Sequence, residues 1–566
     1  MKDFARFILI PALLLALVAC AATPARGLNG RYDLIIRNGI VYDGTGGPGR
    51  RVDVGIRGDR VASLGDLATA TAASEIDAGG RAVAPGFINV LSWANESLIV
   101  DGRGMSDIKQ GVTLEIFGEG ESGGPLTEPM KAGIRRQQRD FEYDIDWTSL
   151  GEYLESLERR GVSPNVASFV GATTVRVHEL GEGDRDPTTG ELDRMQDLVR
   201  DAMREGALGV GSSLIYAPAF FAETPELVAL AQAASEFGGG YISHIRNESY
   251  GIGQALDELI TIARESGAHS EVYHLKAAGE ANWGRMSEAI ARIEQARAAG
   301  LPVSADMYTY TAGATGLDAA MPLWVQAGGL DAWVGRLKDP ALRARVIADI
   351  RNPPAGEENL FRMAGSPDRL KFIGFKDEKL KPLTGKTLAE VMALRATSAE
   401  DTIVDLVVED HSRVDTVYFL MSEDKVRLGI AQPWVSFGSD AAALAPEGVF
   451  LKSSTHPRAY GNVARLLGKY VREERVLSLQ EAIRRLTRLP ASNWKLKDRG
   501  CIDPGCYADV VVFDPATIRD QATFDDPRQY AIGVAHVFVN GVQVLRDGEH
   551  TGAKPGRVVR GPGWTG

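Results

Sequence analysis

Cysteine and histidine are both scarce in this sequence, which has three Cys and eight His among 566 residues. Cys501 and Cys506 are not spaced as a zinc-binding pair and have no partner cysteines elsewhere, which excludes a cysteine-based zinc site. Whether these two form a disulfide across their turn is left open, because the same spacing suits two unpaired residues in a hairpin. Since His is rare, each His that falls in a motif carries weight.

Positive charge is also in short supply, with 63 Lys and Arg against 75 Asp and Glu and a formal net charge of −12. This balance argues against a nucleic-acid partner, which needs a basic face to neutralise phosphates. The sequence has no low-complexity tract, and 44% apolar and 24% charged residues are typical of a globular protein. A chain of this length predicts two domains, one of them large.

The N-terminus has the pattern of a targeting segment. Lys2 and Arg6 precede or flank an apolar run, Phe7 to Val18, that is too short for a comfortable membrane span. Leu-Val-Ala-Cys20 then matches the pattern at which bacterial lipoproteins are cleaved and lipidated on Cys. Ordinary signal cleavage near Ala21-Ala22-Thr23 is the alternative. Residues 1–20 therefore predict an exported, periplasmic protein, anchored to a membrane through lipid on Cys20.

The two ends of the remaining chain predict short strands joined by turns. Apolar residues alternate at period two in four segments, Tyr32 to Asp43, Val52 to Gly65, Ala508 to Asp514 and His536 to Val544. We therefore expect residues 30–83 and 495–557 to form one small β-sandwich domain.

The middle of the chain, residues 84–494, alternates short apolar runs with helical stretches, which indicates a parallel sheet with crossover helices. The eight candidate strands are Val83 to Val90, Val112 to Phe117, Val166 to Val170, Leu208 to Ser212, Tyr241 to Ile245, Glu271 to Leu275, Val303 to Asp306 and Trp434 to Gly438. Eight such units predict an α/β fold of the (β/α)8 TIM-barrel type. Helices are expected at Glu226 to Phe237 and Ser287 to Ala299. An insertion at about 310–432 should hold further helices, one of them at Gly385 to Leu394.

Reactive residues of such barrels lie at the C-terminal ends of the strands. This rule selects His244 and His274, Glu119 with Glu121 as a reserve candidate, and Asp440. Two imidazoles and a carboxylate can bind one zinc or another divalent metal and leave a position for water. Asp440 can then take a proton from water and pass it to the leaving amine.

Other features near these strand ends indicate function less specifically. Lys276 is either a solvated loop charge or an anion-binding group, and Arg246, two residues after His244, is a further candidate for substrate binding. Gly118-Glu-Gly-Glu-Ser-Gly123 fits the dinucleotide-binding pattern of spaced glycines. No strand with a terminal acidic residue follows it at the expected distance, and its two carboxylates would repel a pyrophosphate, so we predict no nucleotide cofactor.

Several longer motifs together identify a family. They are Ala84-Pro-Gly-Phe-Ile, Gln110-Gly-Val-Thr, Gly206-Ala-Leu-Gly, Ser243-His-Ile-Arg-Asn-Glu-Ser, His274-Leu-Lys-Ala-Ala-Gly, Ala305-Asp-Met-Tyr-Thr-Tyr, Gly438-Ser-Asp-Ala, His456-Pro-Arg-Ala-Tyr-Gly and Ala508-Asp-Val-Val-Val-Phe-Asp-Pro. With these motifs, the chain resembles the D-aminoacylases, the N-acyl-D-amino-acid deacylase branch of the amidohydrolase superfamily, from about Tyr32 to about Arg557.

The resemblance implies a barrel with a flanking β-sandwich and zinc bound at His244 and His274. It also implies that Asp440 is the catalytic acid and base, and that Lys276, Tyr308 and Arg458 hold the α-carboxylate of the substrate.

The chain departs from the family pattern at three strand ends. Leu91-Ser92-Trp93 stands where the family carries His-X-His, so a second metal site is missing and a single metal is expected. The family's Cys ligand after the second strand is absent, which makes Glu119 the best substitute. The third strand ends in Gly171-Ala-Thr in place of Gly-His-Gly.

Three functions follow from these residues. The leading hypothesis is a metal-dependent amidohydrolase that acts on small N-acyl amino acids. The second is a hydrolase of dipeptides that contain D-amino acids, or of lactams, on the same scaffold. The third is a non-catalytic binding protein descended from the family.

Overall fold

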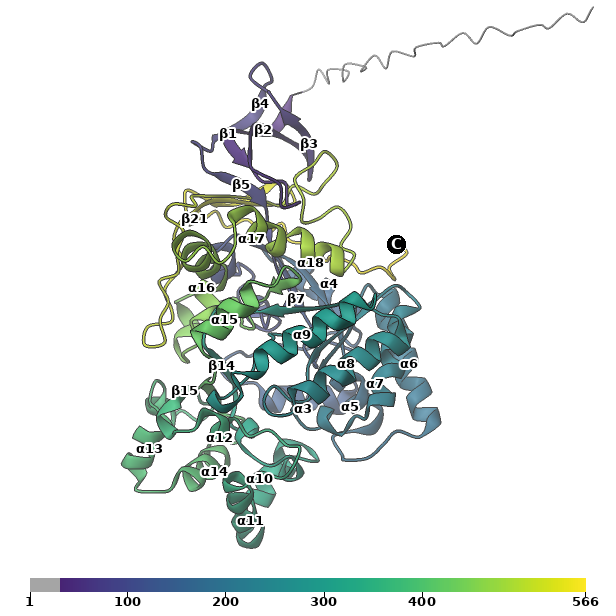
Figure 1. The fold of residues 1–566 in the computed structure, drawn as a ribbon, viewed down its shortest axis with the longest axis vertical. Coiled ribbons are helices and arrows are strands. Elements are labelled where there is room, and N and C mark those ends of the chain that lie inside the picture. The colour runs from purple at the N-terminus through teal and green to yellow at the C-terminus, as the bar shows by residue number, and fades with distance from the viewer. Residues whose placement is uncertain (1–30) are drawn as a thin grey trace, which may run out of the picture.

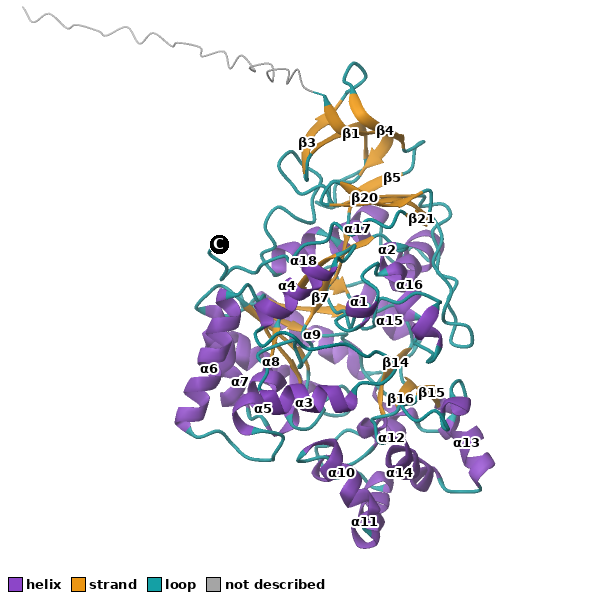
Figure 2. Cartoon of the chain, turned by 180° about the vertical axis from the view of Figure 1, so that it is seen from behind, coloured by secondary structure: helices purple, strands orange, loops and turns teal. Residues whose placement is uncertain are grey.

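The computed structural model describes residues 31–566, which form three regions along the longest axis (Figures 1 and 2). A small β domain lies at one end, a barrel surrounded by helices lies in the middle, and an insertion lies at the other end. The predicted signal segment and Cys20 lie outside the described residues. Within residues 31–566, no helix has the length and apolar character of a membrane span.

Eight short parallel strands of the described chain form the barrel, which confirms the predicted fold class. In ring order they are β6 (Phe87–Asn89), β7 (Val112–Phe117), β8 (Asn165–Ser168) with β9 (Val170–Gly171), β10 (Gly209–Ser213), β11 (Gly240–His244), β12 (Ser270–Val272), β13 (Val303–Met307) and β17 (Val435–Phe437). β8 and β9 are two parts of one strand separated by Phe169, whose N–H donates to the Phe117 carbonyl at 2.9 Å. A parallel bridge between Ser92 and Ala441 joins the last strand to the first and closes the ring.

Helices follow the strands and cover the outside of the barrel (Figure 2). They are α1 (Ser97–Val100), α2 (Met105–Ile108), α3 (Glu128–Gln137), α4 (Leu150–Arg160), α5 (Ala172–Leu180), α6 (Thr189–Arg204), α7 (Thr224–Ser235), α8 (Ile252–Ser266), α9 (Arg285–Ala298), α15 (Glu423–Ile430), α16 (Arg458–Arg465), α17 (Leu479–Leu486) and α18 (Arg488–Asn493). α7 and α9 confirm the two helices predicted in this region. Local signals fix their starts: Ser149 and Glu152 form a reciprocal capping box at α4.

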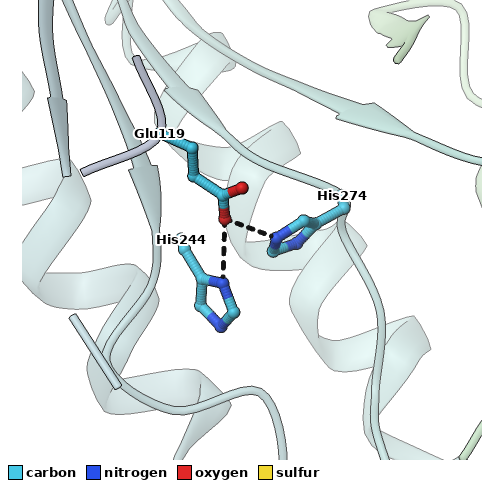
Figure 3. A group of neighbouring side chains, drawn as sticks. All are labelled: Glu119, His244 and His274. Atoms are coloured by element: carbon cyan, nitrogen blue, oxygen red, sulfur yellow. Dashed lines mark hydrogen bonds and ion pairs between the residues drawn. The ribbon is translucent and has the colours of Figure 1, made fainter. Parts of the chain in front are cut away.

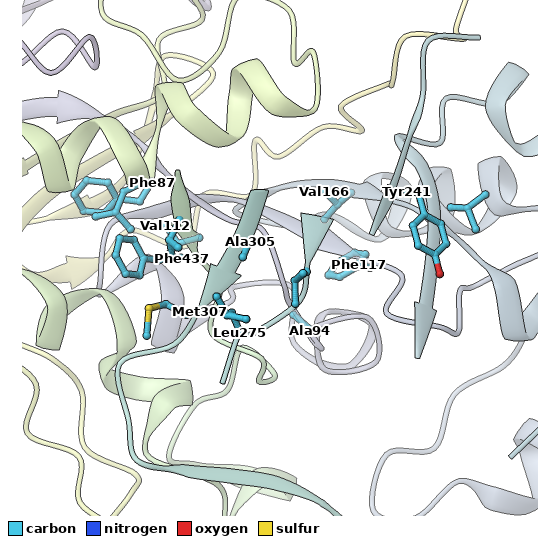
Figure 4. Packing of buried hydrophobic residues seen from close by; sticks show 14 of the residues in the cluster. Phe87, Ala94, Val112, Phe117, Val166, Tyr241, Leu275, Ala305, Met307 and Phe437 are labelled. Atoms are coloured by element: carbon cyan, nitrogen blue, oxygen red, sulfur yellow. The ribbon is translucent and has the colours of Figure 1, made fainter. Parts of the chain in front are cut away.

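Two layers of apolar side chains hold the barrel together. The outer layer, between strands and helices, includes Phe87, Phe117 and Phe437 (Figure 4). The inner layer fills the barrel with side chains such as Ile116 and Phe169, and the fully buried Trp494 packs edge-on against Phe169 at a ring distance of 4.6 Å. Burying a large apolar side chain contributes about 1.5–3 kcal/mol each. The barrel is therefore a packed core that presents loops at its mouth, and it encloses no pore.

The β domain is built from both ends of the described chain. Its sheet runs in the order β21, β20, β19, β18, β5, β1, β2, β3, with β4 paired to β1. The strands are β1 (Tyr32–Val41), β2 (Arg50–Arg57), β3 (Arg60–Gly65), β4 (Ala72–Asp77), β5 (Ala82–Pro85), β18 (Val510–Phe513), β19 (Val534–Val539), β20 (Val542–Arg546) and β21 (Glu549–His550). Apolar residues from both ends, among them Ile36, Val54 and Val512, share one core.

The first predicted barrel strand is wrong as one element. Residues 82–85 form β5 and pair with β18 and β1, whereas β6 begins at Phe87 and pairs with β7. Gly86 lies between them, where a Cβ would stand 2.1 Å from the Thr113 hydroxyl oxygen. The chain passes from the β domain to the barrel at this close approach, and both strands are fully buried, so no alternation marks the break.

The insertion contains helices, as expected, and also a three-stranded antiparallel sheet that the sequence did not predict. Its strands are β14 (Ala312–Gly316), β15 (Leu370–Gly374) and β16 (Asp415–Phe419), and its helices are α10 (Gly329–Lys338), α11 (Pro340–Arg351), α12 (Leu360–Ala364), α13 (Leu388–Arg395) and α14 (Ala399–Asp410). α13 is the helix predicted near residue 390. The insertion has an apolar core of its own, which includes Phe372 and Val404.

Cys501 and Cys506 form a disulfide, with an S–S distance of 2.08 Å. The turn between them lies against β3, because the Gly505 carbonyl accepts from the Arg60 guanidinium at 2.8 Å and the Cys506 carbonyl accepts from the Val61 N–H at 2.9 Å. The question that the sequence left open is thus answered in favour of the bond.

Candidate metal centre

Four predicted residues gather at the C-terminal ends of the barrel strands. His244 ends β11, Glu119 and His274 follow β7 and β12 by two residues, and Asp440 follows β17 by three. The backbone of His274 and of Asp440 is left-handed, with φ of 35° and 50°. Such conformations cost on the order of 1 kcal/mol or more for a non-glycine residue and cluster at functional sites.

Hydrogen bonds from neighbouring strands hold these two strained residues. The His274 N–H donates to the Asp306 carboxylate at 2.9 Å, and the Asp440 N–H donates to the Leu91 carbonyl at 2.9 Å. Asn89 accepts from the N–H of Ser439 at 2.8 Å, which fixes the turn that carries Asp440. The surrounding strands therefore determine the position of both side chains.

Glu119, His244 and His274 form one compact, buried group (Figure 3). Oε1 of Glu119 lies 3.1 Å from Nδ1 of His244 and 3.0 Å from Nε2 of His274, and the three donor atoms all lie within 4.8 Å of one another. Ligand atoms around a tetrahedral zinc ion stand about 3.4 Å apart, given bonds of about 2.0–2.2 Å. Two imidazole nitrogens and a carboxylate oxygen therefore fit zinc both in chemistry and in spacing.

The electrostatics of this group also favour a cation. Burial and the Lys276 ammonium lower the pKa of His274, but the carboxylates of Glu248 and Glu119 raise it by more, to about 10. Burial would raise the pKa of Glu119, yet the two imidazoles hold it well below its usual range. The surroundings thus stabilise positive charge between these side chains, which a divalent ion supplies.

Asp440 lies beside this group and is held at both oxygens. Its Oδ2 pairs with Nη2 of Arg458 at 2.8 Å, and its Oδ1 accepts from the indole N–H of Trp93 at 3.1 Å. The same indole N–H lies 2.9 Å from Oε2 of Glu119. Burial raises the pKa of Asp440 above its ordinary value, although Arg458 opposes this. A carboxyl group with a raised pKa suits proton transfer near neutral pH.

Arg458 and Tyr308 present unused polar atoms beside Asp440. The Arg458 side chain is 3% exposed, and within residues 31–566 its Nε and Nη1 have no hydrogen-bond partner; the same holds for the Tyr308 hydroxyl. The guanidinium lies over the Tyr308 ring at 4.5 Å. Buried donors without partners are costly, and these atoms keep a hydrogen-bonding capacity that an anionic group can satisfy.

The third residue predicted for the α-carboxylate, Lys276, has partners already. Its Nζ lies 2.6 Å from Oε1 of Glu248 and 2.7 Å from Nδ1 of His274. Glu248, which no sequence pattern indicated, also lies 3.1 Å from Nδ1 of His274 and 3.6 Å from Nε2 of His244. It lies beside both imidazoles on the side away from Glu119, and its contact with Nδ1 fixes the orientation of the His274 ring.

Two further predictions are corrected or resolved by the structure. Glu121 is exposed and lies outside the metal-binding group, so Glu119 is the carboxylate of this group. Arg246 directs its guanidinium to the Glu258 carboxylate and to the carbonyls of Phe220 and Ala222. Its placement does not support substrate binding, because these contacts engage the side chain in holding the loop before α7.

Comparison with known proteins agrees with this geometry. A sequence model of the amidohydrolase family matches residues 74–545 of this chain. Two proteins of Alcaligenes xylosoxydans xylosoxydans are each 32% identical to it over 532 residues. They are an N-acyl-D-glutamate deacylase, with 94% of this chain and 97% of the relative covered, and a D-aminoacylase, with 93% and 97% covered.

Solved structures are similar over the same length. An N-acyl-D-glutamate deacylase from Bordetella bronchiseptica, complexed with zinc and a phosphonate inhibitor, has a TM-score of 0.78 at 30% identity, and 94% of this chain and 100% of that one are covered. A D-aminoacylase with a binuclear metal center, described as having one-metal activation and second-metal attenuation, has a TM-score of 0.76 at 32% identity with the same coverage.

Proposed function

This chain belongs to the amidohydrolase family and hydrolyses C–N bonds other than peptide bonds, and we propose that its substrates are N-acyl-D-amino acids. The observation that carries the proposal is the buried group of Glu119, His244 and His274, with Asp440 beside it and the unpaired donors of Arg458 and Tyr308 next to Asp440. The hydrolysis of an N-acyl amino acid uses all three parts. The metal-binding group and Asp440 serve the amide that is cleaved, and the donors of Arg458 and Tyr308 serve the free carboxylate that is bound.

Glu119, His244 and His274 would hold one zinc ion, and the metal supplies a Lewis acid that polarises the amide carbonyl and lowers the pKa of water. The Glu248 carboxylate accepts from the Nδ1–H of His274 and keeps that ring in place, and the Lys276 ammonium holds the same carboxylate at 2.6 Å. A fixed ring direction preserves the position of the ligand atom during turnover.

Asp440 moves the proton. As a carboxylate it takes a proton from the attacking water, and as a carboxylic acid it gives that proton to the amine that leaves. Arg458 at Oδ2 and the Trp93 N–H at Oδ1 hold the carboxylate in one orientation. Leu91, whose carbonyl binds the Asp440 N–H, fixes the backbone from the neighbouring strand.

Arg458 and Tyr308 would bind the α-carboxylate of the substrate, with Lys276 near them. The two free nitrogens of Arg458 and the free hydroxyl of Tyr308 can each donate to a carboxylate oxygen. With its carboxylate bound in this way, the substrate would have its acyl amide next to Asp440, which pairs with the same Arg458.

We expect Arg458→Met to raise KM for N-acyl-D-amino acids by about 10- to 100-fold, since a hydrogen bond to a charged group is worth about 1.5–3 kcal/mol. The steady-state kinetics of the variant should be compared on an N-acyl-D-amino acid and on the matching N-acyl amine without a carboxylate. The substrate without a carboxylate cannot contact Arg458 directly, so its kinetics show only the effect of the substitution on Asp440, the partner of Arg458.

Arg465→Met is the matched control, because Arg465 lies on the same helix α16 and pairs with Asp520 at 3.2 Å. It should leave KM for both substrates within about twofold, as expected for a substitution away from the bound groups. If Arg458→Met lost equal activity on the two substrates, the arginine would not bind the carboxylate.

A panel of N-acetyl, N-formyl and dipeptide substrates of both chiralities tests the substrate class as a whole.

We also propose that the chain is exported and lipid-anchored through Cys20, on the strength of its N-terminal sequence. In a bacterial host, the full chain should appear in the membrane fraction, and mass spectrometry of its N-terminal peptide should find acyl chains on Cys20 that are absent from the Cys20→Ala variant. A chain that stays in the cytosol, or a wild-type N-terminal peptide without acyl chains on Cys20, would overturn the proposal.

A further inference from the structure

Trp93 stands between the metal-binding group and the acid–base residue. It follows β6, where its backbone N–H donates to the Ala441 carbonyl at 3.0 Å, so its position is set by the closure of the barrel. Its half-buried side chain points its indole nitrogen at two carboxylates, 2.9 Å from Oε2 of Glu119 and 3.1 Å from Oδ1 of Asp440.

Two buried carboxylates at this spacing repel each other unless a donor or a cation lies between them. Each already uses one oxygen elsewhere: Glu119 directs Oε1 to the two imidazoles, and Asp440 directs Oδ2 to Arg458. The remaining oxygens, one on each carboxylate, meet at Trp93. Its single N–H is therefore the group that holds these two oxygens together.

We propose that Trp93 is a positioning residue that takes the place of a second cation: its indole N–H holds Glu119 and Asp440 together, and its ring keeps a second metal ion out. The side chain of Trp donates one hydrogen bond, has no lone pair for a metal and carries no charge that pH could change. The site therefore keeps one metal at any zinc concentration that leaves the protein folded. This inference rests on the proposed metal-dependent function.

The contrast with the solved D-aminoacylase gives the proposal a functional consequence. That protein is described as having a binuclear center in which a second metal attenuates activity. In this chain, the Trp93 N–H already lies against one carboxylate oxygen of each residue, Oε2 of Glu119 and Oδ1 of Asp440. Excess zinc should therefore leave the activity of this enzyme unattenuated.

Three replacements of Trp93 distinguish the contribution of its N–H group from that of its ring. Trp93→Phe removes the N–H together with part of the ring, and Trp93→benzothienylalanine replaces the N–H by sulfur at nearly the same ring size. Trp93→His places a metal-binding imidazole beside Glu119 and Asp440. Trp324→Phe is the matched control, because the Trp324 indole N–H also donates to a carboxylate, that of Asp349 at 2.8 Å, within the insertion.

We expect Trp93→Phe and Trp93→benzothienylalanine to lower kcat by about 10- to 100-fold with KM within about twofold, as for other groups that orient a ligand. Trp324→Phe should leave both constants unchanged. Zinc per chain, measured by elemental analysis after dialysis against excess zinc, should be one for the wild type and for Trp324→Phe, and should rise towards two for Trp93→His. The wild type should also keep its activity in that excess zinc.

Three results would overturn the inference. They are a kcat of the benzothienylalanine variant within twofold of the wild type, a Trp93→His variant that still takes up one zinc, and a second zinc on the wild type. The zinc measurement needs no substrate. If the wild type hydrolyses none of the panel but Trp93→His gains a second zinc, the proposed substrate class fails while the role of Trp93 stands.

Discussion

Asp440→Asn is expected to lower kcat for N-acyl-D-amino acids by about 10²- to 10⁴-fold, the range of a general acid–base group. The amide keeps the shape of the side chain and can still face Arg458 and Trp93, so zinc content and fold should be preserved. It cannot accept and return a proton, so kcat falls. KM should change little, because the groups that bind the substrate are unchanged. Steady-state kinetics with zinc analysis on the same sample measures both quantities.

The matched control for this variant is Asp101→Asn. Asp101 is also a partly buried carboxylate paired with an arginine, Arg103, at 2.7 Å, but it lies outside the strand ends that form the site. Its replacement should leave kcat within about twofold, as expected of most substitutions remote from the reacting groups. If Asp440→Asn retained more than a tenth of the wild-type kcat with zinc bound, proton transfer by Asp440 would be wrong.

Loss of the metal is expected to have an effect at least as large. His274→Asn removes one of three protein ligands, and we expect a chain that no longer retains zinc through dialysis and has only background activity. Chelation of the wild type should give the same loss, and added zinc should restore the wild type but not the variant. Elemental analysis before and after each step follows the metal itself.

His269→Asn is the control for the removal of an imidazole. His269 lies before β12, with its Nε2 3.0 Å from the Ser304 hydroxyl oxygen and 3.4 Å from Oε2 of Glu271, so it too is an imidazole beside a carboxylate. This variant should retain zinc and activity. Activity of the wild type that survives chelation would contradict a metal-dependent reaction.

The sequence predicted the barrel because eight short apolar runs alternate with helical stretches. The strand-end rule then located His244, His274 and Asp440 without any knowledge of contacts, since side chains at the ends of neighbouring parallel strands must converge. The strand prediction itself failed at Val83 to Val90, where two buried strands of different sheets meet at Gly86. Nothing in a continuous apolar run shows which sheet each half joins.

The same rule could not assign loop residues. Glu248 lies four residues beyond the end of β11, where no periodicity fixes the direction of a side chain, although it falls within the motif that carries His244. Arg246 lies closer to the strand end and yet turns towards Glu258. The contacts of Trp93 depend on the rotamer that directs its indole N–H to Glu119 and Asp440, and no sequence pattern fixes a rotamer.

The most direct test of this account is an anomalous difference map, recorded at the zinc edge from crystals grown in excess zinc. The account predicts one peak, bonded to Glu119, His244 and His274, with the Trp93 indole N–H still between Glu119 and Asp440. The absence of a peak at these three residues, or a second peak in contact with Asp440, would contradict it.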